Sequence, residues 1–246
     1  MDVVTGVEGL RPEHGPIFAV IGVFDGLHRG HTYLLDHLVQ EAASRRARPT
    51  VITFDHHPDE VLTGSAPPLL LHPDDRLDRL ADAGVEVTVV QHFDDVVRRT
   101  TYDDFIDAIR ERTELAGLLM TPDAAFGFER RGTAGAVVAL GEERGFDVVV
   151  IAPFTMDDAP VSSSQIRAAI QRGDLPAAER MLGRPVEFRG TAGDGTLSFD
   201  WPMALPPDGA YNGRIDGRPG PVNVQDGTVL IDPSSEDGTV RVELTT

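Results

Sequence analysis

From Ile17 to about Gly183, short apolar runs alternate with amphipathic stretches, and this alternation constrains the fold more than any other feature. The apolar runs are rich in Val and Ile and bounded by Gly, Pro or Asp, as buried strands are. Strands that alternate with helices of this length predict an α/β fold, a mostly parallel sheet covered on both faces. The expected strands are Ile17–Val23, Pro49–Phe54, Val85–Gln91, Leu115–Thr121 and Asp147–Phe154, and the expected helices are His31–Arg45, Asp74–Ala83, Tyr102–Glu114, Ala134–Arg144, Gln165–Gln171 and Leu175–Leu182.

The pattern changes after Gly183-Arg184-Pro185, where no convincing helix follows. Short β-like runs separated by Gly, Pro and Asp indicate a small antiparallel β module. We therefore expect one domain over residues 1–184 and a second, which leans on the first, over residues 185–246. The β-like runs are Val186–Arg189, Tyr211–Ile215, Val229–Ile231 and Thr239–Leu244.

Composition excludes several classes of function. The formal net charge of −18 makes a poor surface for DNA or RNA. The sequence has no Cys, which excludes disulfides and thiol nucleophiles and favours the cytoplasm. All basic residues except the histidines are Arg, so a P-loop lysine is absent. No apolar run reaches the roughly 20 residues of a membrane span.

The segment from Gly22 to His31 follows the first expected strand and opens the first expected helix. Gly22 and Gly26 permit tight turns, and Gly30 would let a bulky anion approach the helix. His28 and His31 lie three residues apart and hence on one side of the first turn. Their ring N–H groups, with nearby backbone N–H groups, predict a phosphate site. The alternative is capping or zinc ligation, but zinc would need further ligands.

Three more loops follow expected strands, whose carboxyl ends meet at one edge of a parallel sheet. Thr53–Pro58 contains a His pair before a proline, which also suits a simple turn. Ala125–Gly132 contains two aromatic and two Arg residues that could stack on a ring and hold a phosphate. Core packing explains Phe126 and Phe128 at least as well. Val161–Arg167 brings Ser hydroxyls to a helix entry, where they cap the helix or bind phosphate.

These motifs resemble a known family. His28-Arg29-Gly30-His31 resembles the HxGH signature of the nucleotidylyltransferase superfamily, and Ser162–Arg167 resembles its (S/T)SSxIR partner. The form FDGxHRGH, with TFxxHP, an FxF loop and VSSSxIR, most resembles prokaryotic FAD synthetase, the adenylyltransferase module of bifunctional riboflavin kinase/FMN adenylyltransferase. The resemblance covers residues 15 to 185, including the exit Gly183-Arg184-Pro185.

The resemblance implies a Rossmann-like, doubly wound sheet and the reaction ATP + FMN → FAD + pyrophosphate. It implies Mg²⁺ held mostly by water and substrate oxygens, so we name no protein ligand for the metal. The chemistry would be positioning plus charge stabilisation, without a covalent intermediate. By matching position, the resemblance assigns catalytic roles to His28, His31 and Arg167, ATP contacts to Gly22, Val23, Phe24, Asp25, Gly30, Ser162, Ser163 and Ser164, and FMN contacts to His57, Pro58, Ala125, Phe126 and Phe128.

The sequence departs from the family pattern in three places. Val23 replaces a frequent Asn, and Ala125 and Glu129 alter the third loop. In the tail, Trp201 and Met203 stand where the riboflavin kinase motif GxPTAN has its Thr and Asn. We therefore predict a shortened kinase-like remnant without riboflavin kinase activity.

Two alternatives stay open. The first keeps nucleotidyl transfer but changes the acceptor to an unusual flavin or another phosphorylated alcohol. The second is a catalytically weak flavin- or nucleotide-binding regulator. In every case we expect small-molecule partners and neither nucleic acid nor membrane, while the sequence predicts no particular oligomeric state.

Overall fold

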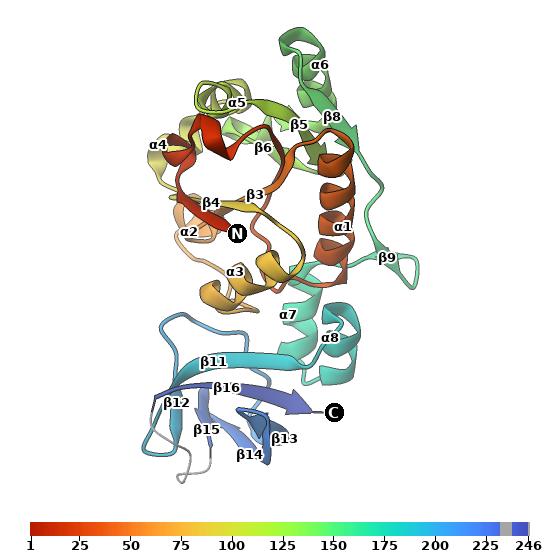
Figure 1. Ribbon diagram of the computed structural model, residues 1–246. Helices are drawn as coiled ribbons and strands as arrows, with labels where there is room; N and C mark the ends of the chain where they lie inside the picture. Colours follow the sequence, from red (N-terminus) through yellow and green to blue (C-terminus); the bar gives the residue numbers. More distant parts are fainter. Residues whose placement is uncertain (232–237, 246) are drawn as a thin grey trace. The chain divides into compact units, whose positions relative to one another are not determined.

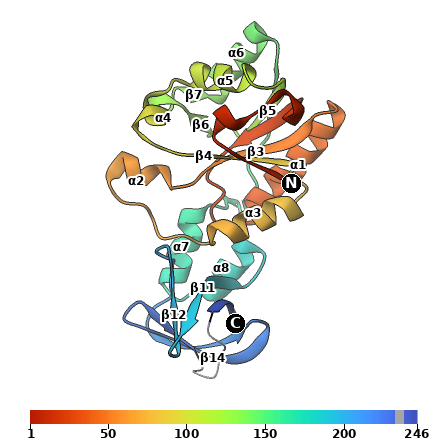
Figure 2. The ribbon, with the colours of Figure 1, turned by 60° about the vertical axis from the view of Figure 1, so that its left-hand side comes forward.

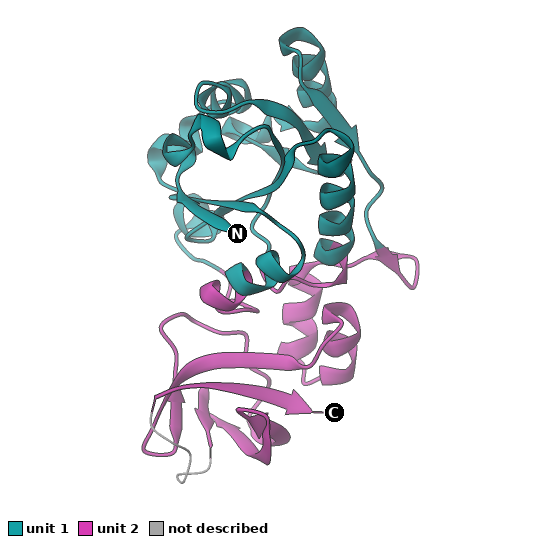
Figure 3. Ribbon diagram, viewed as in Figure 1, with its two compact units in different colours: residues 1–24, 31–66, 77–154 teal, residues 25–30, 67–76, 155–246 magenta. Residues whose placement is uncertain are grey.

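The computed structural model describes residues 1–231 and 238–245. The chain forms two compact units (Figure 3): unit 1 comprises residues 1–24, 31–66 and 77–154, and unit 2 comprises residues 25–30, 67–76 and 155–246. Unit 2 thus contains three segments that precede the expected boundary after residue 184, namely residues 25–30, 67–76 and 155–184. The two units therefore do not coincide with the two expected domains. That boundary stays a prediction, and residues 232–237 and 246 of the expected β module lie outside the described residues.

Unit 1 is built on a parallel sheet (Figure 1). Its strands are β1 (Asp2–Thr5), β2 (Ile17–Ile21), β3 (Arg48–Phe54), β4 (Val87–Gln91), β5 (Leu115–Met120) and β8 (Asp147–Val150). They lie in the order β1-β4-β3-β2-β5-β8, and each neighbouring pair is parallel. The expected parallel α/β fold is confirmed. The strand order reverses at β2, and sheets of this kind bind ligands outside the carboxyl ends of their strands at such a point.

Helices cover both faces of this sheet (Figure 2). α5 (Tyr102–Arg110) and α6 (Ala134–Arg144) share a core with Ile17 and Ala19 of β2. α1 (Arg29–Ser44) and α3 (Pro73–Asp82) lie toward the other face. The remaining elements before residue 155 are short: η1 (Val7–Gly9), η2 (Pro12–His14), α2 (Pro58–Thr63), α4 (Asp95–Arg99), the hairpin of β6 (Ala125–Phe126) and β7 (Gly132–Thr133), and η3 (Phe128–Arg130).

The elements that were not expected from the sequence include β1, α2 and α4. β1 is an edge strand of four residues, too short to show a convincing alternation. α2 and α4 have six and five residues, fewer than the two turns a helical period needs to be visible. The last sheet strand, β8, ends at Val150 and not at Phe154, because the apolar run continues beyond the last ladder pair with β5.

Unit 2 is an antiparallel barrel with two helices packed on it. The closed barrel has the order β11-β12-β15-β14-β13-β16, which confirms the expected antiparallel β module. Apolar residues of the two helices and of the barrel form one core that includes Ile166, Phe188 and Val242. The elements are β9 (Thr155–Met156), β10 (Ala159–Pro160), α7 (Ser163–Gln171), α8 (Leu175–Leu182), β11 (Val186–Gly193), β12 (Thr196–Ser198), β13 (Gly209–Ile215), β14 (Arg218–Gln225), β15 (Thr228–Leu230) and β16 (Gly238–Thr245).

Candidate functional site

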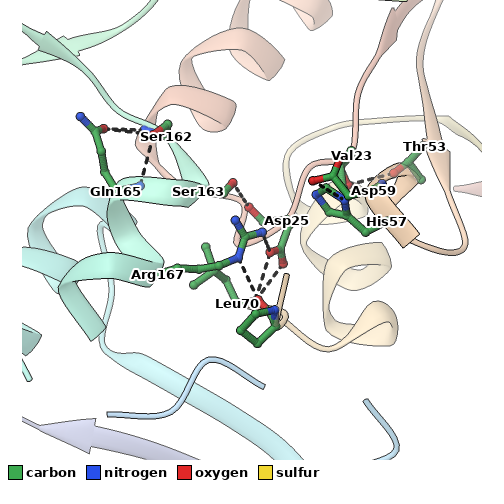
Figure 4. Close-up of polar contacts among 11 residues, drawn as sticks. Val23, Asp25, Thr53, His57, Asp59, Leu70, Ser162, Ser163, Gln165 and Arg167 are labelled. Atoms are coloured by element: carbon green, nitrogen blue, oxygen red, sulfur yellow. Dashed lines mark hydrogen bonds and ion pairs between the residues drawn. The ribbon is translucent and has the colours of Figure 1, made fainter. Parts of the chain in front are cut away.

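Asp25 organises the polar centre of unit 2 (Figure 4). Its side chain is only 2% exposed, and one carboxylate oxygen lies 2.6 Å from Nη2 of Arg167. The backbone N–H of Leu70 donates to the same carboxylate at 3.0 Å, and the hydroxyl of Ser163 donates to the Asp25 carbonyl at 2.9 Å. We call residues 22–31, which contain the HxGH motif, the HxGH loop. Its buried residue Asp25 therefore holds α7, the helix of the (S/T)SSxIR motif. This contact joins stretches 142 positions apart in the sequence.

Arg167 is fixed by two partners. Besides the ion pair with Asp25, its Nε donates to the carbonyl of Pro68 at 2.8 Å. These bonds use Nε and Nη2, so Nη1 is the guanidinium nitrogen that neither uses. Arg167 is 8% exposed, so its charge acts from within the unit and not from a freely moving surface side chain. Its assigned contact with the ATP phosphates stays a proposal.

The three serines before Arg167 occupy different environments. Ser162 caps α7: its hydroxyl accepts from the N–H of Gln165, whose side-chain oxygen accepts in return from the N–H of Ser162. Ser163 is bonded to Asp25, and Ser164 is exposed. Since the first N–H groups of a helix have no partner within it, Ser163 and Ser164 present backbone donors that suit an anion.

His28 is buried at 4% exposure in the turn that leads into α1. Burial, and then the positive charges of Arg184 and Arg167, lower the pKa of His28 from 6.5 to about 4. At neutral pH the ring is therefore neutral, with one nitrogen as donor and the other as acceptor. An anionic phosphate beside the ring would favour its protonated form.

The glycines of this turn are required by contacts in unit 2. Gly26 has a φ of +81°, and a Cβ there would lie 2.9 Å from the Leu70 side chain. A Cβ on Gly30 would lie 3.1 Å from the His28 ring and 3.4 Å from the Val161 carbonyl. A Cβ on Gly30 would thus crowd the His28 ring, which gives a packing reason for this glycine. The expectation that Gly30 lets an anion approach the helix stays a prediction.

The preceding residues of the loop belong to unit 1. The N–H of Gly22 donates to the Ile52 carbonyl at 3.0 Å, and the Val23 carbonyl accepts from the Thr53 hydroxyl at 3.0 Å. Phe24 is buried at a φ of 54°, and its ring centroid lies 5.0 Å from that of His31. These contacts support the loop from within, and a nucleotide contact at any of these positions stays a proposal.

His57 and Pro58, two of the expected FMN contacts, begin α2. Nδ1 of His57 accepts from the N–H of Asp59 at 3.2 Å, and Pro58 occupies the first helical position (Figure 4). Helix capping accounts for the sequence here. A contact of this pair with flavin stays a proposal.

The other expected FMN contacts lie on the hairpin β6–β7. Phe126 packs toward the core, with its ring centroid 6.2 Å from that of Phe105, whereas Phe128 is 37% exposed. Gly127 between them has a φ of +74°, and a Cβ there would lie 2.5 Å from the Tyr102 nitrogen. The backbone turn therefore sends two aromatic side chains into different surroundings. Phe128 has the more exposed ring, and Ala125 pairs with Thr133 in the ladder. Contacts of Ala125, Phe126 and Phe128 with FMN stay a proposal.

A His–Asp group that the sequence motifs did not indicate lies at the ends of β3 and β4. Ligand atoms of Asp55, His56 and His92 lie within 4.8 Å of one another, and Nδ1 of His92 is 2.6 Å from the Asp55 carboxylate. The hydrogen bond and charge of Asp55 raise the pKa of His92. A proton thus competes for the nitrogen that a cation would need, and we interpret the group as an ion pair between loops.

Arg184 is a further residue of the site to which the motifs alone assign no role. It donates to the carbonyls of Gly26 and Leu27 at 2.7 and 3.2 Å and to Glu187 at 3.0 Å. The sequence Gly183-Arg184-Pro185 could have indicated a role for Arg184. An Arg between a helix-ending glycine and a proline has few hydrogen-bonding partners within its own segment.

Together these groups can stabilise phosphate charge without a covalent bond. A neutral imidazole, the first N–H groups of a helix and a buried guanidinium act by position and charge. Both oxygens of the Asp25 carboxylate face donors, at 3.0 Å and 2.6 Å. This carboxylate is thus engaged by protein, which fits a metal that arrives with the substrate phosphates.

Comparisons with known proteins agree with these features. A sequence model of the FAD synthetase family matches residues 10–165. The bifunctional riboflavin kinase/FMN adenylyltransferase of Pseudomonas fluorescens is 32% identical over 191 residues, which are 77% of this chain and 61% of that protein. The Escherichia coli K12 protein of the same name is 31% identical over 194 residues, 77% of this chain and 62% of that protein. The chain thus spans about three fifths of the length of these relatives.

A crystal structure of a protein described as a macrolide-efflux protein from Streptococcus pneumoniae matches with a TM-score of 0.80. The match covers 99% of this chain and 90% of that one at 23% identity, which shows the fold alone. Among the described residues, no helix is both long enough and apolar enough to span a bilayer. Because the family model matches more than half of its residues, the chain belongs to the FAD synthetase family.

Proposed function

We propose that this chain is an FMN adenylyltransferase that transfers AMP from ATP to FMN and releases pyrophosphate. The observation that carries the proposal is the Asp25 centre within unit 2, where Asp25, three residues before His28, is bonded to Ser163 and Arg167 of α7. These are the residues that carry the family motifs. The relatives' names supply the acceptor, FMN, and their activity is extended here to a shorter chain.

In this reaction, an oxygen of the FMN phosphate attacks the α-phosphorus of ATP while the bond to the β-phosphate oxygen breaks. The leaving pyrophosphate takes that electron pair, so negative charge grows on it. His28, His31, Arg167 and the N–H groups of Ser163 and Ser164 would stabilise this charge. Mg²⁺ would arrive as the ATP complex, held by phosphate and water oxygens.

We assign the remaining contacts on the same basis. Gly22 to Asp25, Gly30 and Ser162 would shape the ATP site, the first four through the backbone conformation described above. His57, Pro58, Ala125, Phe126 and Phe128 would contact FMN, with Phe128 offering the exposed ring. The cytoplasm is the proposed compartment, and no nucleic acid or membrane is a proposed partner.

We further propose that the barrel has no riboflavin kinase activity. Met203, which stands where the kinase motif has Asn, is 8% exposed and belongs to the core of unit 2. Its neighbour Ala204 donates its N–H to the Leu69 carbonyl at 2.8 Å. A buried thioether cannot hold a magnesium nucleotide as an amide would.

The test is an assay with ATP, Mg²⁺ and either FMN or riboflavin, with products separated by chromatography. Formation of FAD and pyrophosphate from FMN, with riboflavin unchanged, is the expected result. Turnover of another phosphorylated acceptor while FMN stays inert would replace the acceptor. Tight FMN or ATP binding without pyrophosphate release would refute the enzymatic function.

A further inference from the structure

The segment that enters the barrel also contacts the HxGH loop. Arg184 lies between α8 and β11 and donates to two successive carbonyls of the loop, those of Gly26 and Leu27. These carbonyls directly precede His28. A Cβ on Gly183 would lie 3.2 Å from the Arg29 side chain, and one on Gly26 would lie 3.6 Å from Leu182. The residues on both sides of His28 are thus packed against this one segment.

Arg184 is in turn held by the barrel. Its Nε donates to Glu187, the second residue of β11, at 3.0 Å. Side chains alternate along a strand, so Glu187 faces away from Val186 and Phe188. It is nevertheless only 6% exposed. Glu187 also lies directly opposite Glu243 of β16, and like charges so placed oppose folding unless a cation offsets them. Arg184 supplies that cation.

The charges around His28 come from separate elements of unit 2. Arg184 and Arg167 lower the pKa of the ring, each with its own carboxylate partner, Glu187 and Asp25. Asp25 belongs to the loop that precedes His28, whereas Glu187 belongs to the barrel. Arg184 is therefore the link through which the barrel reaches His28.

We propose that Arg184, held by Glu187 of the first barrel strand, is a positioning residue for His28. The C-terminal barrel is then part of the adenylyl-transfer machinery in this chain. The reaction in this proposal is the one given under the proposed function. The position of Arg184 beside the HxGH loop comes from the hydrogen bonds described above. Arg suits this place because its fork bonds two carbonyls and a carboxylate at once, which a lysine ammonium on a flexible stem does not.

The test compares full-length Arg184→Gln, Arg184→Lys and Glu187→Gln with Arg189→Gln as the matched control. Arg189 lies on the same strand and pairs with Asp75, but it makes no contact with the HxGH loop among those described. Each variant is measured for kcat and KM with ATP and FMN. The pKa of His28 is followed by NMR of isotope-labelled histidine, with His28→Asn for assignment.

For Arg184→Gln we expect kcat to fall about 10- to 100-fold, as for a reacting group displaced by about 1 Å, with KM for FMN nearly unchanged. The His28 pKa should rise from about 4 and stay below 6.5, because burial remains. Arg184→Lys should keep the low His28 pKa yet recover only part of kcat. Glu187→Gln should lower kcat less, and Arg189→Gln should match the wild type in both readouts.

The proposal requires both changes in Arg184→Gln, so a change in kcat alone or in pKa alone overturns it. An equal loss in Arg189→Gln also overturns it, since the effect would then be general destabilisation. If Arg184→Gln does not fold, the kcat of Glu187→Gln is compared with that of Arg189→Gln. A lower kcat in Glu187→Gln alone supports the proposal, and equal values overturn it. If the wild type forms no FAD, the proposed function fails, and the NMR titration still shows whether Arg184 sets the surroundings of His28.

Discussion

Replacement of Asp25 by Ala tests the buried ion pair at the centre of unit 2. The change leaves the Arg167 guanidinium without its carboxylate at a position where the two side chains are 9% and 2% exposed. Removing one partner of a buried pair costs about 3–5 kcal/mol, because the remaining charge stays desolvated. At roughly 2–4 °C per kcal/mol for a chain of this size, the unfolding midpoint should fall by about 6–20 °C.

The assay is urea and thermal unfolding followed by fluorescence. The sequence has one Trp, Trp201, which lies in unit 2 and therefore reports the unit that contains Asp25. Asp74→Ala is the control: Asp74 lies 3.4 Å from Arg189 with its side chain 61% exposed, so its loss should cost less than about 1 kcal/mol.

A second substitution separates the lost charge pair from a general loss of packing. In Asp25→Ala, adding Arg167→Met removes the unpaired charge and should restore part of the lost stability. The reasoning fails if Asp25→Ala costs no more than Asp74→Ala, or if Arg167→Met makes the single variant still less stable.

Three further predictions concern the loops. The His28 pKa is about 4 in the folded state and 6.5 ordinarily, so the unfolded chain binds more protons between pH 6.5 and 4. The free energy of unfolding of the wild type should therefore fall by about 3 kcal/mol as the pH drops through this range. Urea unfolding at a series of pH values should show this loss in the wild type and not in His28→Asn. Gly30→Ala should lower kcat because its Cβ would lie 3.1 Å from the His28 ring, whereas Gly135→Ala, with open space around it, should leave kcat unchanged; equal rates would contradict this. Phe128→Ala should raise KM for FMN with little effect on unfolding, whereas Phe126→Ala should destabilise unit 1; the reverse pattern would exchange their roles.

The parallel sheet and the antiparallel module could be predicted because their strands carry strong local patterns. The helices Ala134–Arg144 and Leu175–Leu182 were predicted to the residue, since capping and Gly ends mark them: Thr133 and Asp174 cap the starts, and Gly145 and Gly183 end them. β1 escaped prediction because four residues at a sheet edge bury little apolar surface.

For the site, local sequence predicted short-range contacts and not the long-range ones. Ser162 and the start of α7 could be predicted as a cap from their spacing. The Asp25–Arg167 pair could not, because nothing in either motif indicates that one carboxylate faces the other motif's guanidinium across 142 positions. The reason for Gly30 likewise depends on a packing contact with His28 that only the three-dimensional structure contains.

A structure of the complex with Mg²⁺ and α,β-methylene-ATP, which cannot be cleaved at the α–β bridge, tests the central claim most directly. The account predicts phosphate oxygens about 2.7–3.2 Å from a ring nitrogen of His28 and from the backbone nitrogens of Ser163 and Ser164. A nucleotide bound elsewhere, with these groups in contact only with protein, would contradict it.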